Sequence, residues 1–308
     1  MKNIKKLLNF NIKEKINLIE EIFILYYGEE YRSYITESLK KLIFIPYINS
    51  KKFDLYYQKR ELLKNENLKK RLEGYSIKKK FIKMINKKQI GFNENVLKNN
   101  NVGMIPNIAN NELITTIYFP ILGIKKERLD LVLIHEVLHV IEEHIIENSE
   151  SNVILGGGFE KWVLKGKDEN NREFEFFNEL IHHEISKEIT DLMHSKNLYL
   201  FLEKKDSKEK CCEDCSLVIK EFYYSFKEPL IRSKLVGDID KFEGIVGKKE
   251  LGCLAKWCVE FYNEYQTPKE RKELERLKNK KYLNKIEEGL NIVNEMKRKQ
   301  NIIKKMIY

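Results

Sequence analysis

The sequence predicts an α+β protein that is predominantly helical, with a small sheet and helical N- and C-terminal parts. Apolar residues recur at the helical period of about 3.6 over most of the chain. Strand-like segments are few and short, and 34% of the residues are charged. No run approaches the roughly 18 consecutive apolar residues that a membrane span needs. These features are typical of a soluble, helix-rich protein with no membrane partner.

The N-terminal region, residues 1–95, is expected to be helical. Apolar residues near a 3.6 period cover 12–45, and the Lys-rich stretch 51–90 is also mostly helical. Residues 93–112 are rich in turn formers and indicate a boundary. The first residues carry positive charges but no uninterrupted apolar run, so we interpret them as an amphipathic helix and not a secretion signal.

The central region, residues 96–203, alternates strands and helices. β-branched and aromatic residues predict a strand at 113–120, and apolar periodicity predicts helices at 127–147 and 177–203. Between these helices, residues 153–177 contain two short strand-like segments around a turn. The expected order is therefore strand, helix, hairpin, helix.

The C-terminal region, residues 204–308, begins with a polar loop at 204–216 and continues as helices. Residues 268–306 are so charged that we expect them at the surface. Cys211, Cys212 and Cys215 lie in the loop. Cys212 and Cys215 form a CxxC without a clear second pair, which favours ordinary thiols over a structural metal site. Five cysteines and no secretion signal indicate reduced thiols in a cytoplasm.

The net charge of +10 does not by itself indicate a nucleic-acid partner. Lysine outnumbers arginine 48 to 9, whereas arginine is favoured for paired hydrogen bonds to bases and phosphates. We expect a diffusely charged surface. A basic helical nucleic-acid binder is a remaining alternative, which salt-dependent retention of DNA or RNA would reveal.

Residues 135–139, His-Glu-Val-Leu-His, carry the strongest functional signal. His135 and His139 lie about 40° apart on one helical face, so both imidazoles can reach one zinc ion at about 2.0–2.1 Å. Glu136 flanks the metal without binding it and can act as general base. A chance occurrence is the alternative, but all six histidines of the chain lie between 135 and 194. His144 is turned about 140° from His139 and is expected to cap or pack.

A third ligand is expected from the second helix of the central region. On a helical wheel Glu179 shares a stripe with the small residues Ser186 and Thr190, which allow another helix to approach. Glu184 falls on a charged face and is interpreted as a solvated carboxylate. His182 remains an alternative ligand, and His183 is better placed as a partner of a ligand.

HEVLH followed about 40 residues later by Asn178-Glu179 resembles the gluzincins, the thermolysin-type peptidases with a His, His, Glu zinc site. The segments IYFPILG, LIHEVLHVIE, GGG and FFNELIHHEI look more like a bacterial family of largely uncharacterised zincin-like proteins. The resemblance covers roughly residues 110–200 and implies a zincin-like core with a small sheet, an HExxH helix and a glutamate helix. Thermolysin-type enzymes carry Ser-Asp where this chain has His182-His183.

The resemblance also implies a substrate groove. In zincins the strand before the active helix pairs with the substrate, so residues 113–119 are expected to offer a strand edge to a peptide. The Gly156-Gly157-Gly158 run either walls the groove or is a flexible connection. Tyr223, Tyr224 and His194 are candidate donors to the developing oxyanion.

These observations predict a zinc metallopeptidase that hydrolyses peptide bonds of a peptide or protein substrate. His135, His139 and Glu179 are its expected ligands and Glu136 its base. The alternative is a non-catalytic or regulatory zincin-like protein that binds a partner. The intact Glu136 favours the enzyme, because a structural site has no use for a base.

Overall fold

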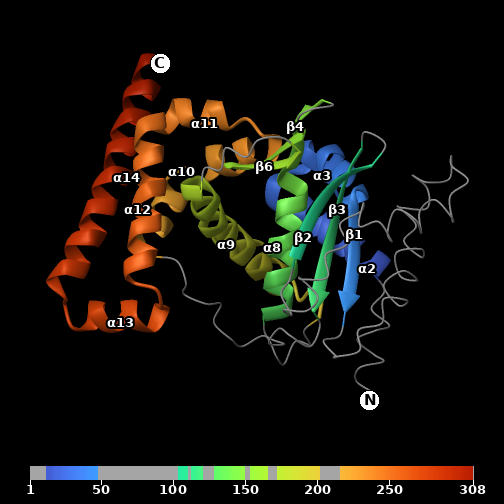
Figure 1. Ribbon diagram of the computed structural model, residues 1–308, viewed down its shortest axis with the longest axis horizontal. Coiled ribbons are helices and arrows are strands. Elements are labelled where there is room, and N and C mark those ends of the chain that lie inside the picture. The colour runs from blue at the N-terminus through green and yellow to red at the C-terminus, as the bar shows by residue number, and fades with distance from the viewer. Residues whose placement is uncertain are drawn as a thin grey trace, which may run out of the picture. The chain divides into compact units, whose positions relative to one another are not determined.

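A computed structural model describes residues 12–47, 103–109, 112–120, 128–149, 153–165, 172–201 and 216–307 (Figure 1). The chain divides into two compact units, described in turn below. The first unit comprises Met1–Ile141 and Ser186–Glu209, and the second comprises Glu142–Ile185 and Lys210–Tyr308. The fold is mostly helical with small sheets, as the sequence predicts. The division into regions 1–95, 96–203 and 204–308, which we expect from the sequence, stays a prediction.

The first unit begins with α2 (Ile12–Tyr27), a short 3₁₀ turn η1 (Glu29–Tyr31) and α3 (Arg32–Lys40). The predicted helix over 12–45 is therefore wrong at its end, where β1 (Leu42–Tyr47) takes over. The sequence LIFIPY is rich in β-branched and aromatic residues, and its proline cannot continue a helix. The expected helices at 51–90 lie outside the described residues.

A three-stranded sheet follows in the order β1-β3-β2. β3 (Glu112–Pro120) confirms the predicted strand and pairs parallel with β1. β2 (Gly103–Ala109) pairs antiparallel with β3, although its residues lie in the stretch read as a boundary. Pairing with β3 supplies the hydrogen bonds that local composition does not indicate. Figure 1 shows the three strands side by side, with β3 in the middle.

Helix α8 (Leu129–Glu142) carries the HEVLH segment. It is shorter than the predicted helix at 127–147, because the chain continues as β4 (Glu143–Asn148) in pairing with β5. Asp130 in its first turn is fully buried and accepts hydrogen bonds from Phe201 N at 2.8 Å and Leu200 N at 3.1 Å. His194 Nε2 lies 3.0 Å from the same carboxylate. Asp130 thereby fixes the start of α8 to the segment that follows α9.

Helix α9 (Arg172–Ser195) begins earlier and ends earlier than the predicted helix at 177–203. Its apolar face is confirmed, since Ile181, Ile185 and Ile189 are fully buried. The interpretation of Glu184 as a solvated carboxylate is wrong, because its residue is only 2% exposed. The helical wheel treats α9 alone, whereas packing covers this side of the helix as well.

The second unit has a sheet of order β4-β5-β6. β5 (Val153–Gly157) and β6 (Glu160–Lys165) confirm the two predicted strand segments and form an antiparallel hairpin. Their turn lies at Gly158, whose φ of +60° is a left-handed conformation that favours glycine. The Gly-rich run is thus part of the hairpin.

The rest of the second unit is helical, as predicted. α10 (Leu217–Val236), α11 (Ile239–Val246), α12 (Lys248–Glu264) and α13 (Pro268–Arg276) lead to α14 (Lys280–Ile307). α14 packs on α10, α11 and α12, and Figure 1 shows α12 and α14 running side by side. A Cβ on Gly289 would meet Trp257 at 2.7 Å, so glycine permits this close helix packing. α14 buries Val293 and Met296, while most of its charged residues remain at the surface.

Within the part of the chain that the structure describes, no helix is long and apolar enough to cross a membrane. Cys253 is an exposed free cysteine and Cys258 a buried one, and burial raises the pKa of the Cys258 thiol well above its ordinary value. The cysteines of the predicted CxxC, together with Cys211, lie outside the described residues.

Candidate metal centre

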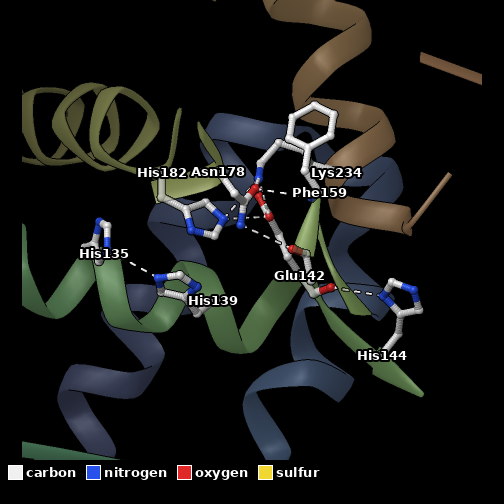
Figure 2. A network of polar contacts seen from close by, with 9 residues as sticks. His135, His139, Glu142, His144, Phe159, Asn178, His182 and Lys234 are labelled. Atoms are coloured by element: carbon white, nitrogen blue, oxygen red, sulfur yellow. Dashed lines mark hydrogen bonds and ion pairs between the residues drawn. The ribbon is translucent and has the colours of Figure 1, made fainter. Parts of the chain in front are cut away.

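The two histidines of HEVLH converge on α8, as the helical spacing predicts. The Nε2 atoms of His135 and His139 lie 3.3 Å apart (Figure 2). Two ligand atoms about 2.0–2.1 Å from one tetrahedral zinc ion lie about 3.3 Å from each other. The separation of the two nitrogens therefore matches the separation that a shared zinc ion requires.

Packing of α8 determines which side chains remain accessible. Ile134, Val137, Leu138 and Ile141 are fully buried, so they hold the helix in the core. His135 and Glu136 are only half-buried, and His139 is 6% exposed. The motif thus places one imidazole at the edge of the core, the other just inside it, and a half-buried carboxylate next to the outer one.

Glu179 on α9 joins this pair. Ligand atoms of His135, His139 and Glu179 all lie within 4.8 Å of one another. Two imidazole nitrogens and one carboxylate oxygen form a donor set that zinc accepts, and three protein ligands leave a fourth position for water or substrate. The structure brings together the three side chains predicted as ligands, and that they bind zinc stays a prediction.

His182, the alternative ligand, belongs to a different cluster. Its Nε2 atom lies 2.8 Å from Glu142 Oε2 and 3.1 Å from Lys234 Nζ. The distance to the carboxylate indicates that Nε2–H donates to Glu142. His182 is fully buried, and its Nε2 atom is directed at the Glu142 carboxylate. The group formed by His135, His139 and Glu179 does not include it.

We call the four fully buried side chains Glu142, Asn178, His182 and Lys234 the lysine cluster. Lys234 Nζ forms an ion pair with Glu142 Oε2 at 2.9 Å and donates to Asn178 Oδ1. Figure 2 shows the four side chains converging from α8, α9 and α10. The cluster therefore ties the last residue of α8 to the neighbouring helices.

Asn178 also holds the turn of the β5–β6 hairpin. Its Nδ2 donates to Gly157 O at 3.3 Å, and its Oδ1 accepts from Phe159 N at 3.3 Å. A Cβ on Gly158 would clash with Lys234 Nζ and lie 2.6 Å from Asn178 Oδ1, and the φ of +60° is itself unfavourable for any other residue, so the position favours glycine. The prediction that residues 156–158 are a flexible connection is wrong, because the run belongs to a hairpin whose turn is held by hydrogen bonds.

The remaining candidate residues have varied settings. His183 is half-buried, four residues after Glu179 on α9, and its expected role beside a ligand stays a prediction. Tyr223 is fully buried, whereas Tyr224 is 59% exposed, so only the second side chain is open to a substrate as the structure stands. Their role as oxyanion donors also stays a prediction. His194, the third candidate donor, contacts Asp130 and stacks on Tyr199.

Two further expectations have clear outcomes. The prediction that residues 113–119 offer a free strand edge to a peptide is wrong. They belong to β3, the central strand of its sheet, with β1 on one side and β2 on the other. His144 is a capping residue, as expected, with its Nδ1 3.2 Å from Glu142 O at the end of α8.

Lys234 was not predicted as part of any site. Its only sequence signal is its position among residues that α10 buries, next to Leu235 and one turn after Leu230 and Ile231. A lysine at an apolar position of an amphipathic helix is a weak but usable sign of a buried charge.

Comparison with protein families, with curated proteins and with solved structures found no match to this chain in any of the three. The resemblance to gluzincins therefore rests on the motifs alone, and the fold and the geometry of the site carry the functional argument.

Proposed function

We propose that this protein is a zinc-dependent metallopeptidase with a zincin-like core formed by β3, α8 and α9. One observation carries the proposal, namely the convergence of two α8 imidazoles and the Glu179 carboxylate within 4.8 Å of one another. The 3.3 Å separation of the two Nε2 atoms is compatible with two ligands of one tetrahedral zinc ion.

His135, His139 and Glu179 would hold the metal. A bound zinc ion would supply Lewis-acid activation of a water molecule and of the scissile carbonyl. His135 and Glu179 are half-buried, whereas His139 is almost fully buried, so a peptide would approach from the side of the two half-buried ligands.

Glu136 would act as the general base. It follows His135 directly on α8, about 100° around the helix, so its carboxylate flanks the metal position without being a ligand. It would take a proton from the attacking water and pass it to the nitrogen of the leaving amine. Peptides or proteins are the proposed substrates. The free thiols of Cys253 and Cys258 support a cytoplasmic location for this activity.

Glu136→Gln tests the proposal. The variant keeps the shape of the side chain and all three ligands, so it should bind zinc as the wild type does. Cleavage of a mixed peptide library, followed by mass spectrometry, should fall by about 10²–10⁴-fold, the usual contribution of a general base. Glu287→Gln, at an exposed position of α14, is the matched control and should cleave normally.

Two outcomes would contradict the proposal. Equal cleavage by Glu136→Gln and the wild type would remove Glu136 from the chemistry. A wild type that binds zinc but cleaves no peptide would favour the alternative, a zincin-like protein that binds a partner without catalysis.

A further inference from the structure

We propose that Lys234 is a positioning residue for the zinc site and that it sets the placement of α8 and α9 through the lysine cluster. This inference rests on the proposed function. Lys234 belongs to α10, and its Nζ contacts Glu142 on α8 together with Asn178 and His182 on α9.

The cluster lies close in sequence to the proposed ligands. Glu142 follows His139 by three residues, and Asn178 precedes Glu179 directly. Residues on one helix keep fixed relative positions, so a displacement of Glu142 or Asn178 would move the ligand on the same helix. Catalytic and metal sites require placement within about 0.5 Å. A single ammonium that holds both helices is suited to that requirement.

The surroundings of Lys234 leave it little freedom. The residue is fully buried, and Gly158 packs directly on its Nζ. The ammonium also lies 5.3 Å from the centre of the Phe159 ring, on the hairpin that Asn178 holds. Its position is thus fixed from α8, from α9 and from the β5–β6 turn.

Stability alone does not account for a lysine here. Removing two charges from water costs several kcal/mol per ion, and well-packed apolar residues in place of a buried ion pair often give a protein that is equally stable. The directional contacts of an ammonium, however, specify where each acceptor must lie. Lys234 therefore contributes geometry that an apolar side chain of the same size would not.

A double variant separates geometry from stability. Lys234→Met with Glu142→Gln removes both charges and keeps similar shapes, so no uncompensated charge remains buried. The zinc affinity of the purified chain is measured by competition with a chelator, and the visible spectrum is recorded after cobalt substitution, because its bands report ligand geometry. Arg271→Met is the matched control. It removes a buried cation from α13 that donates to Tyr265 O at 2.8 Å, and α13 carries no proposed ligand.

We expect the double variant to bind zinc about 10–100-fold more weakly, the loss typical of residues that orient metal ligands. Its cobalt spectrum should shift, while Arg271→Met keeps the wild-type affinity and spectrum. Wild-type affinity and spectrum in the folded double variant would overturn the positioning role and leave the zinc site intact. Absence of zinc from the wild type would overturn the proposed function and this inference with it.

If the double variant does not fold, Lys234→Arg takes its place. It keeps the buried positive charge but replaces the compact ammonium by a larger planar group, so the contacts to Glu142 and Asn178 cannot both keep their geometry. Weaker zinc binding with a shifted cobalt spectrum would support the positioning role, and wild-type values would overturn it.

Discussion

Helices α8 and α9 carry two clusters of imidazole and carboxylate side chains. The two clusters differ in burial, and the second one contains a cation that the chain itself supplies. The proposed metal group, His135, His139 and Glu179, includes two half-buried residues. The lysine cluster also contains a carboxylate, Glu142, and an imidazole, His182, but all its side chains are fully buried. In the lysine cluster the cation is Lys234, supplied by the chain itself.

The difference shows why the presence of histidine and carboxylate does not suffice to predict a metal site. An ammonium within 2.9 Å of a carboxylate occupies the position that a metal ion would need and already compensates the negative charge. The proposed metal group keeps two of its three side chains half-buried and brings its ligand atoms within 4.8 Å of one another, which is the arrangement that a metal ion with an accessible fourth position needs. We therefore expect one zinc ion per chain, at the metal group.

The largest expected change in stability concerns the lysine cluster. Glu142→Gln keeps the shape of the side chain but leaves the Lys234 ammonium buried without its counter-charge. We expect a loss of about 3–5 kcal/mol in the free energy of unfolding, measured with denaturant. Glu295→Gln is the control, because its partner Arg298 is exposed, and it should cost less than about 1 kcal/mol. A loss below about 1 kcal/mol for Glu142→Gln would mean that the charge of Glu142 is not needed by Lys234.

A pair of variants on α9 sharpens the contrast. Glu179→Ala should weaken zinc binding by at least about 10–100-fold, because it removes a ligand and not merely a partner of one. Glu184→Ala should leave zinc affinity unchanged but lower stability by about 1–3 kcal/mol, since its residue is buried. Chelator competition and denaturant unfolding on both variants give the comparison. Loss of zinc from Glu184→Ala and not from Glu179→Ala would exchange their assignments.

The smallest effect is expected at the end of α8. His144→Ala removes the ring nitrogen near Glu142 O and should cost about 1 kcal/mol, the usual value of one hydrogen bond. Zinc content should stay as in the wild type, because His144 is a capping residue. Zinc loss from this variant would extend the metal group beyond the three proposed ligands.

The sequence predicted the parts of the proposed site that depend on local geometry. His135 and His139 meet because they lie one helical turn apart, a spacing that any α-helix converts into a shared face. The glutamate on α9 followed from its place on a stripe with Ser186 and Thr190, which are indeed buried. β3 was recognisable from its β-branched residues for the same reason.

The features that the sequence did not predict depend on tertiary packing. Lys234 lies 56 residues from Asn178 along the chain, so no local pattern links them. β2 is a strand because β3 offers it hydrogen bonds, and α8 ends at Glu142 because β4 pairs with β5. Glu184 was misread because a helical wheel gives the direction of a side chain and not what covers it.

Metal analysis of the purified wild type beside His139→Ala tests the central claim most directly. After reconstitution with zinc and removal of the excess, the wild type should hold one zinc ion per chain. His139→Ala should hold much less than one, while the lysine cluster remains intact. A wild type without zinc, or a His139→Ala variant that retains a full equivalent, would contradict the assignment of His135, His139 and Glu179 as the metal site.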